Sequence, residues 1–258
     1  MRTIAIMNNK GGVGKSATTI SLADILVHDH QKRVSIVDCD GQANATHFFL
    51  PEFKSDDGVT ICDVMHGECE TVWSDNFQTI REGLTILPGD SALYMMDIAS
   101  IRNGIDQRAK RSLLDIRNAA EEDGETDFML FDCPPGYTTA SVSALSAVDE
   151  VILPMLMDAF AFEGLRTMLE QIALLRKDNP RLQVSGALIT QWHRCDSVEQ
   201  GEALLHKIRV PIFQTVIRRS EKLVESTYDR TPIREYSPGS AASQDYRKLA
   251  RELLGKEI

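Results

Sequence analysis

The stretch that decides the fold is Asn8–Thr19, which is NNKGGVGKSATT. It nearly matches the phosphate-binding pattern G-x-x-x-x-G-K-[ST], and its positions Gly14–Ser16 supply the required glycine, lysine and hydroxyl residue. Asn9 occupies the place of the first glycine of the pattern, and the next residue is a lysine, Lys10. The loop therefore offers two lysines to one phosphate chain, and Lys10 is the unusual one.

Each part of this loop has a chemical reason to bind phosphate. Its glycines allow backbone N–H groups to approach a phosphate chain without a clash from Cβ atoms, and the following helix directs its positive end at the same place. Lys15 supplies a charge for the terminal phosphates, and the Ser16 hydroxyl is a ligand for Mg²⁺. The predicted nucleotide-binding residues are Gly11, Gly12, Val13, Gly14, Lys15, Ser16 and Ala17.

The residues around the loop predict a strand, a turn and a helix. The apolar run Thr3–Met7 precedes the loop, and apolar residues at helical spacing follow it within Ser16–Val27. Further apolar runs of strand length occur at Arg33–Asp38, Leu84–Pro88, Phe128–Asp132, Val151–Met155, Val184–Thr190 and Ile212–Ile217. Helical patterns accompany them at Ser112–Glu122, Phe162–Lys177, Val198–Lys207 and Ser243–Leu254.

Strands that are apolar on both faces and alternate with helices predict an α/β fold. The expected architecture is a doubly wound, mostly parallel sheet with helices on both faces, of the P-loop NTPase type. We find no repeat, no low-complexity segment and no long linker, so residues 1–258 are predicted to form a single domain. Residues 41–83 are the least regular segment, and their role stays open.

The composition limits the possible partners and the compartment. The chain has 258 residues, of which 43% are hydrophobic, and its net charge of −10 gives no overall attraction to nucleic acid or to an anionic membrane. Any DNA binding must therefore come from a local basic patch. Five cysteines without a C-x-x-C spacing indicate reduced thiols in a cytoplasmic protein. We find no signal peptide, no membrane-spanning apolar run and no histidines at metal-ligand spacing.

Three carboxylates follow predicted strands, at the edge where open α/β sheets bind ligands. Asp38 and Asp40 belong to VDCDGQAN, Val37–Asn44, at the end of the second predicted strand. Two carboxylates there can position a metal-bound water or polarise an attacking one, although an ordinary polar turn has the same pattern. Asp132 ends the run FMLFD, which is typical of a Walker B strand whose carboxylate holds a Mg²⁺-bound water.

Together these segments resemble one family nearly from end to end. The chain resembles the ParA/Soj partition ATPases, of the deviant Walker A class that also contains MinD. The resemblance rests on NKGGVGKSATT, VDCDGQANAT and FDCPPG, and on the terminal segments TVIRRSEKLVES and TPIREYSPGSAASQDYRKLARELL. It implies an ATPase that uses ATP and Mg²⁺, with Ser16, Asp132 and Asp38 near the metal.

The resemblance gives Lys10 a role. In this class it is the signature lysine, which reaches across a dimer interface to the nucleotide of the other subunit. Such a cation, together with Lys15, stabilises the charge that develops on the phosphoryl oxygens during transfer. ATP would then hold a homodimer together and ADP would release it, so hydrolysis and dimerisation form one switch. The alternative for Lys10 is a solvated loop lysine.

By the same resemblance, Asp40 is the catalytic carboxylate that orients the attacking water, and Asp38 supports the loop or the metal shell. The family pattern D-x-D-P-Q-G-N is broken at two positions, where Gly41 replaces proline and Ala43 replaces glycine. Gly41 loosens the turn after Asp40, which leaves the geometry of hydrolysis open. Ala17 replaces the usual threonine of the phosphate loop but keeps the backbone N–H that meets the α-phosphate.

The resemblance also implies that the ATP dimer binds DNA without sequence preference, which requires basic side chains aimed at phosphates. The first candidates are Arg218, Arg219 and Lys222. The patch is open to extension by Arg209, Arg230, Arg234, Arg247 and Lys248. Solvated surface charge is the alternative for each, and Arg218 has a second alternative, contact with the nucleotide, since many relatives carry a proline near the adenine at its position.

The implied partners are a second copy, DNA and a ParB-like centromere-binding protein that stimulates slow hydrolysis. The role would be segregation of plasmid or chromosomal DNA by a cytoplasmic, nucleoid-associated protein. The cargo and the hydrolysis rate stay open. Because the chain begins at the phosphate loop, we expect no N-terminal helix-turn-helix extension and no operator-specific repression.

Other functions of the same class stay open. A MinD-like ATPase would act on a membrane, but Gln244–Ile258 carries acidic residues and is predicted to pack on the core, so no stable membrane association is expected. A cargo-positioning ATPase that acts on a protein complex would use the same chemistry. Cys133 lacks the motif context of a shared iron–sulfur cluster and is predicted to be a buried thiol. Trp73 and Trp192 are predicted to pack, with Ile189–Asp196 near the base pocket.

Overall fold

The computed structural model describes residues 1–68, 72–158, 161–194 and 210–256. Its strands are β1 Arg2–Ile6, β2 Val34–Asp38, β3 Gln78–Arg81, β4 Leu84–Leu87, β5 Phe128–Asp132, β6 Glu150–Met155 and β7 Gln183–Ile189. Its α-helices are α1 Lys15–His30, α2 Asn44–Phe49, α3 Ile61–His66, α4 Leu93–Asn103, α5 Gln107–Asp123, α6 Thr139–Ala147, α7 Ala161–Leu175, α9 Glu221–Tyr228, α10 Ile233–Tyr236 and α11 Ala241–Leu253. Short 3-10 helices occur at Ser55–Asp57 and Trp73–Asn76. The predicted helix Val198–Lys207 lies outside the described residues.

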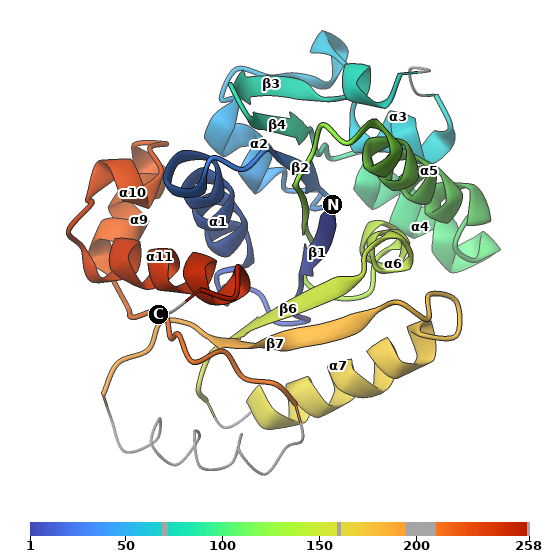
Figure 1. Cartoon of the computed structure of the whole chain (residues 1–258). Coiled ribbons are helices and arrows are strands. Elements are labelled where there is room, and N and C mark those ends of the chain that lie inside the picture. The colour runs from blue at the N-terminus through green and yellow to red at the C-terminus, as the bar shows by residue number, and fades with distance from the viewer. Residues whose placement is uncertain (69–71, 159–160, 195–209, 257–258) are drawn as a thin grey trace.

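The strands form one seven-stranded sheet in the order β3-β4-β2-β5-β1-β6-β7. All neighbours pair in parallel except β3 and β4, which form an antiparallel pair at one edge. Helices cover both faces of the sheet (Figure 1). This arrangement confirms the predicted doubly wound, mostly parallel α/β fold. The fold could be predicted because strands that are buried on both faces are continuous apolar runs in the sequence.

Each face of the sheet has its own hydrophobic core. On one face, α1, α2, α10 and α11 pack against β1, β2, β4 and β5 through side chains such as Leu22 and Tyr246. On the other, α3–α7 pack against the same sheet through side chains such as Met65 and Phe131. The apolar face of α11 is buried, with Leu249 at 0% and Leu253 at 7% exposure, as predicted for the terminal segment. Within the described ranges, no helix combines the length and apolarity that a membrane span requires.

The prediction of a strand at Ile212–Ile217 was wrong. The segment runs beside β7 but forms only isolated bridges, from Ile212 to Ala187 of β7 and from Arg218 to Trp192 beyond the end of that strand. Its backbone N–H groups at Gln214 and Thr215 donate instead to the Glu252 carboxylate of α11, at 2.7 and 3.0 Å. Phe213 and Ile217 still donate hydrogen bonds to β7, at 3.0 and 2.8 Å, so the bonds to Glu252 interrupt the ladder of a regular strand between them.

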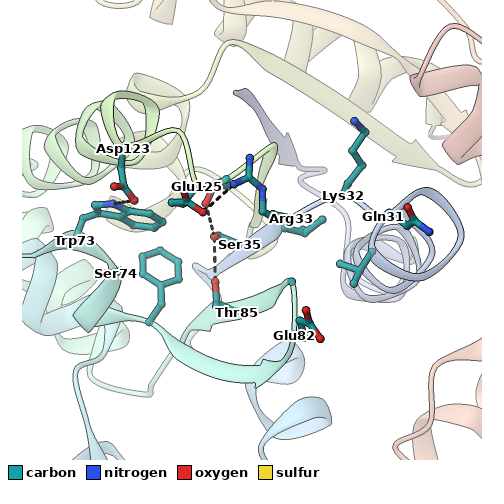
Figure 2. Close-up of a pocket in the computed structure, with 15 residues that line it drawn as sticks. Gln31, Lys32, Arg33, Ser35, Trp73, Ser74, Glu82, Thr85, Asp123 and Glu125 are labelled. Atoms are coloured by element: carbon teal, nitrogen blue, oxygen red, sulfur yellow. Dashed lines mark hydrogen bonds and ion pairs between the residues drawn. The ribbon is translucent and has the colours of Figure 1, made fainter.

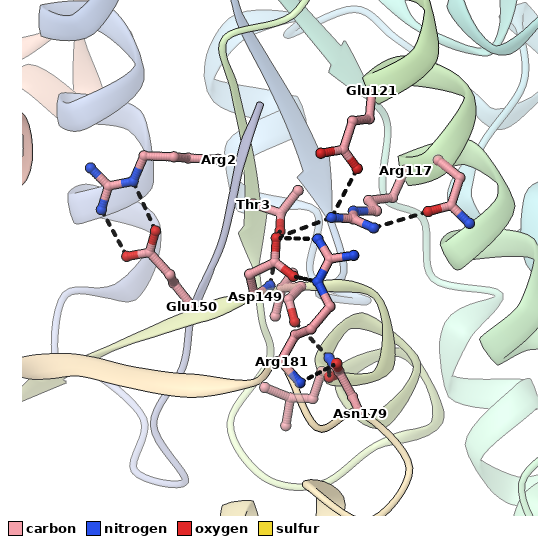
Figure 3. Close-up of polar contacts among 11 residues, drawn as sticks. Arg2, Thr3, Arg117, Glu121, Asp149, Glu150, Asn179 and Arg181 are labelled. Atoms are coloured by element: carbon pink, nitrogen blue, oxygen red, sulfur yellow. Dashed lines mark hydrogen bonds and ion pairs between the residues drawn. The ribbon is translucent and has the colours of Figure 1, made fainter.

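Ion pairs organise the edge of the sheet where the strands begin. Arg117 of α5 and Arg181, which precedes β7, both bind the carboxylate of Asp149, at 3.1 and 2.8 Å (Figure 3). Nearby, Arg2 of β1 binds Glu150 of β6 at 2.7 Å. These contacts join α5 and three strands, so the charges at this edge are used to hold elements together.

A cavity of about 620 Å³ opens at the same edge, beside the starts of β2 and β4 (Figure 2). Trp73 forms one wall, donates a hydrogen bond to Asp123 at 3.2 Å, and packs edge-to-face on Phe77 at 5.4 Å between ring centroids. Ser35 and Thr85 contribute a hydrogen-bonded pair of hydroxyls at 3.0 Å. Trp73 thus packs as predicted. The cavity lies where the strands begin, at the opposite end of the strands from the phosphate loop.

Candidate nucleotide site

The candidate site lies at the opposite edge, where the parallel strands end. β1, β5 and β2 lie side by side, and their register aligns Asp132 with Ile6 on one side and with Asp38 on the other. The phosphate loop leaves β1 immediately after Ile6. Because the carboxyl ends of parallel strands meet at one edge, residues that are far apart in sequence gather here.

The phosphate loop has the backbone conformation that its glycines permit. Gly12 and Gly14 have φ angles of 72° and 87°, in the left-handed region that side chains disfavour. α1 begins directly after Gly14, with no side-chain cap and no acidic residue in its first turn. The N–H groups of that turn are therefore left for an anion. Thr190 and Gln191, which directly follow β7, hold the loop through hydrogen bonds of 2.8 Å from their side chains to the backbone oxygens of Val13 and Gly12.

Lys15 points into the loop. Its side chain is almost buried, with the residue 7% exposed, and the ammonium donates a hydrogen bond of 3.0 Å to the Lys10 carbonyl oxygen. Desolvation lowers the pKa of Lys15, while the charges of Asp132 and Asp40 act in the opposite direction. A phosphate chain in the loop would add negative charge beside this ammonium and favour its charged form.

Asp132 has a free acceptor atom suited to a cation. One carboxylate oxygen accepts a hydrogen bond of 3.2 Å from Thr19, whereas the other, Oδ2, is buried without a partner in the described part of the chain. Burial first, and then the charge of Asp38, raise the pKa of Asp132 to about 8. A buried acceptor atom without a partner is costly, so this orphaned oxygen fits a site for Mg²⁺ and its waters, and the Ser16 side chain is near enough to lower the pKa of the same carboxylate.

Asp38 holds the turn that follows β2. Its carboxylate accepts hydrogen bonds of 2.8 Å from both the backbone N–H and the hydroxyl of Thr46, and one of 3.2 Å from the Asp40 N–H. Burial raises the pKa of Asp38 to about 6. Gly89 closes against this turn so tightly that a Cβ there would lie 2.8 Å from the Asp38 carbonyl oxygen. Of the two roles that the sequence left open for Asp38, this geometry favours support of the loop.

Asp40 lies in a compact turn at the mouth of the site. The residue is 6% exposed, and its carboxylate accepts the Gln42 N–H at 2.9 Å while its carbonyl oxygen accepts the Ala43 N–H at 2.8 Å. Ala43, which stands where the family has glycine, has a φ of 51° and therefore keeps the left-handed conformation of that glycine. The loss of the glycine has left the shape of the turn in place but at a conformational cost.

Restoring the glycine is expected to stabilise the protein. Ala43→Gly should raise the free energy of unfolding by roughly 0.5–1 kcal/mol, because the cost of about 1–2 kcal/mol that an L-residue has at a positive φ exceeds the entropic cost of about 0.5–1 kcal/mol that glycine brings. Urea unfolding followed by circular dichroism measures this difference. The matched control is Ala119→Gly inside α5, which should lower stability by about 1 kcal/mol. Equal losses in the two variants would show that Ala43 is not strained.

Lys10 lies at the rim of the site and turns away from Lys15. Its ammonium pairs with Asp158, which follows β6, and the two side chains are 45% and 37% exposed. The side chain of Asn8 shapes this end of the loop, since it accepts the Lys10 N–H at 2.9 Å and donates to Pro154 O at 2.7 Å. In this state the signature position faces solvent and is held by an exposed ion pair.

A cavity of about 310 Å³ continues from the phosphate loop and has room for a base. Ala17 lines this cavity together with Thr190 and Gln191, which belong to the segment Ile189–Asp196 that is predicted to lie near the base. Residues of α9 and Tyr246 of α11 complete the lining. No local pattern indicates that these two helices belong to the site, because only the folded chain brings them to the loop.

The basic candidates for DNA contact that the structure describes do not form one free patch. Arg218 lines the base cavity and binds the buried Asp245 at 2.8 and 2.7 Å, which favours the alternative that places it near the nucleotide. Lys222 pairs with Glu225 at 2.7 Å on the surface of α9, and Arg219 is exposed beside it.

The outer candidates are also divided. Arg234 binds the fully buried Asp24 at 2.6 Å, and Arg247 binds Asp29 at 2.8 Å, so both hold helices together. Lys248 is exposed, and Arg230 lines a groove beside Ser16. Arg209 lies outside the described residues.

The cysteines agree with the thiol prediction where they are described. Cys39, Cys62 and Cys133 are free and buried, and Cys69 and Cys195 lie outside the described residues. Burial raises the pKa of the Cys39 thiol well above its usual value. In the part of the chain that the structure describes, no group of three or more His, Cys, Asp or Glu side chains has a metal-binding arrangement.

Comparisons with known proteins bear on this geometry. Residues 1–184 match a family model described as an AAA domain. The chromosome partitioning protein ParA of Caulobacter vibrioides is 32% identical over 264 residues, which cover 100% of this chain and 95% of that protein. The sporulation initiation inhibitor protein Soj of Bacillus subtilis is 30% identical, with 98% of each chain covered. Among solved structures, cobyrinic acid a,c-diamide synthase from Mycobacterium smegmatis with bound ADP and magnesium has a TM-score of 0.78 at 25% identity, with 98% and 94% covered.

Proposed function

This chain belongs to the ParA/Soj-type ATPases of the AAA-domain family, and we propose that it is an ATP-dependent dimeric switch that binds DNA without sequence preference. In this proposal one ATPase domain, residues 1–258, hydrolyses ATP slowly with Mg²⁺ until a ParB-like partner stimulates it. Its role is the segregation of plasmid or chromosomal DNA on the nucleoid. The observation that carries the proposal is the convergence of Lys15, Asp40 and Asp132 beside a cavity with room for a base.

The residues of the site would divide the work. The first turn of α1 and Lys15 bind the phosphates, while Ser16 and Asp132 hold Mg²⁺. The metal, when bound, neutralises charge that develops on the phosphoryl oxygens. Asp40 orients the attacking water, and the hydrogen bonds of Asp38 to Thr46 keep the turn of Asp40 in place.

The proposed DNA contact centres on Arg219. It is exposed beside the base cavity, whereas the Arg218 guanidinium is committed to Asp245. Lys222, at the start of α9, can add charge close to Arg219, because an exposed ion pair such as Lys222–Glu225 is worth little and exchanges easily for phosphate. Two copies in one dimer double this modest patch, which compensates for the acidic net charge of the chain.

The proposal is tested by nucleotide-dependent DNA binding. Fluorescence anisotropy with a random-sequence duplex should show binding by the wild type with ATP, and at least about tenfold weaker binding with ADP or without nucleotide. Lys15→Ala should lose the ATP effect, because the loop no longer holds the terminal phosphates. Equal binding in all nucleotide states would overturn the switch.

Two single charge removals locate the DNA surface in the same assay. Arg219→Ala should weaken ATP-dependent DNA binding and reduce its salt dependence while ATP turnover is retained. Lys32→Ala is the matched control, since it removes one charge at the other edge of the sheet, on the cavity of Figure 2. If the two variants behave alike, the DNA surface lies elsewhere.

A further inference from the structure

Tyr94 of α4 lies directly on the turn that carries Asp40. A Cβ built on Gly41 would lie 2.8 Å from the ring carbon next to the Tyr94 hydroxyl and 3.0 Å from its two neighbours. The φ angle of Gly41 is not in the left-handed region, so its backbone would accept a side chain. The ring of Tyr94 is therefore what occupies the space beside residue 41, where the family pattern has the ring of a proline.

The next turn of α4 reaches the second loop of the site. The Asp97 carboxylate accepts a hydrogen bond of 2.8 Å from the backbone N–H of Thr139, at the start of α6. α6 follows the loop that leaves Asp132 at the end of β5. Residues three apart share one face of a helix, so Tyr94 and Asp97 project toward the site side by side. α4 and α6 lie against each other in the fold (Figure 1).

We propose that α4 is a brace that fixes the turn of Asp40 relative to the loop after Asp132, and that Tyr94 is a positioning residue for ATP hydrolysis. The contact with Gly41 does for this chain what a proline ring does by stiffening the backbone of the turn. Gly41 alone would leave the turn loose, since glycine restricts its backbone least. This inference rests on the proposed function, because it assigns to Asp40 the water that hydrolysis requires.

The electrostatic surroundings of Tyr94 agree with this placement. Desolvation, followed by the charges of Asp40 and Asp97, raises the pKa of Tyr94, so both carboxylates act on the ring hydroxyl. The residue is nevertheless 47% exposed, which means that its ring can swing into solvent if the space beside Gly41 is taken. A side chain at residue 41 should therefore displace the ring without unfolding the protein.

The test is a double-mutant cycle on ATP hydrolysis. Tyr94→Ala should lower kcat by roughly tenfold and leave KM for ATP within about twofold, because the turn loses its support while the phosphate loop is untouched. Tyr94→Phe should retain wild-type kcat, since it keeps the ring. Gly41→Ala should lower kcat to a similar extent, and the double variant should be no slower than either single variant, because both changes remove one contact.

Met95→Ala is the matched control, since Met95 is the next residue on α4 and is 65% exposed. If Tyr94→Ala and Met95→Ala have the same kcat, or if the effects of Gly41→Ala and Tyr94→Ala multiply, the brace is refuted. Thermal unfolding of the same four proteins of the cycle does not depend on turnover. If the wild type hydrolyses no ATP, the proposed function fails, but the Tm values still test the contact. Tm changes at positions 41 and 94 that are not additive would show that the contact exists, and additive changes would refute the brace independently of the proposed function.

Discussion

Replacing Asp40 with alanine is expected to lower kcat for ATP hydrolysis by roughly 100-fold or more, which is the usual range for the loss of a group that activates the nucleophile. ATP should still bind, because no hydrogen bond or ion pair joins the Asp40 carboxylate to the described phosphate loop or to Lys15, and this carboxylate accepts the Gln42 N–H at 2.9 Å. An ATP-bound dimer that cannot reach the ADP state should remain on DNA. The lifetime of the DNA complex in ATP should therefore lengthen by a similar factor.

Two measurements on the same sample decide this prediction. Single-turnover hydrolysis gives the chemical step, and a competitor chase with unlabelled DNA gives the lifetime of the complex. Gln42→Ala is the control, since it alters the same turn but retains the backbone N–H that Asp40 accepts. If Asp40→Ala lost ATP binding, the carboxylate would be part of the nucleotide pocket, and if it hydrolysed ATP at the wild-type rate, another group would orient the water.

The parts of the fold that the sequence predicted are those with local signals. The strands that end at Ile6, Asp38 and Asp132 are apolar on both faces, so each appears as a continuous apolar run. The phosphate loop is encoded by its own glycines and by the lysine and hydroxyl that follow them. Adjacent Asp38 and Asp132 follow from parallel pairing alone, once both runs are recognised as neighbouring strands.

What the sequence could not show depends on contacts between distant residues. The Arg218–Asp245 pair, which draws a predicted DNA-binding residue toward the base cavity, joins residues 27 positions apart. The contact of Tyr94 with Gly41 depends on how α4 packs, which the spacing of apolar residues in the sequence does not indicate. The segment Ile212–Ile217 has the composition of a strand, but Glu252 takes two of its N–H groups. In each case a side chain far along the chain changes the role that local pattern suggests.

Lys10→Ala is expected to lower kcat on the order of 100-fold, because a cation near the phosphoryl oxygens stabilises charge that appears only in the transition state. Within one chain, Lys10 pairs with Asp158 at the surface, away from Lys15. That pair is exposed and contributes about 1 kcal/mol or less, so the lysine can exchange it for a phosphate in a partner subunit. Asp158→Ala, which frees Lys10, should keep turnover at or above the wild-type level.

Mixing two inactive variants tests whether Lys10 acts on the nucleotide of the other subunit. In a dimer of Lys10→Ala with Asp40→Ala, the first subunit keeps its own Asp40 and receives an intact Lys10 from its partner. One of the two nucleotide sites of the mixed dimer is therefore complete, and the other lacks both residues. Random pairing in an equal mixture gives about half mixed dimers, so turnover should return to about a quarter of the wild-type value. A mixture as inactive as its components would contradict this model and show that Lys10 acts on the nucleotide of its own subunit. In that case Lys10 would have to leave Asp158 and turn toward the phosphates bound by the same chain.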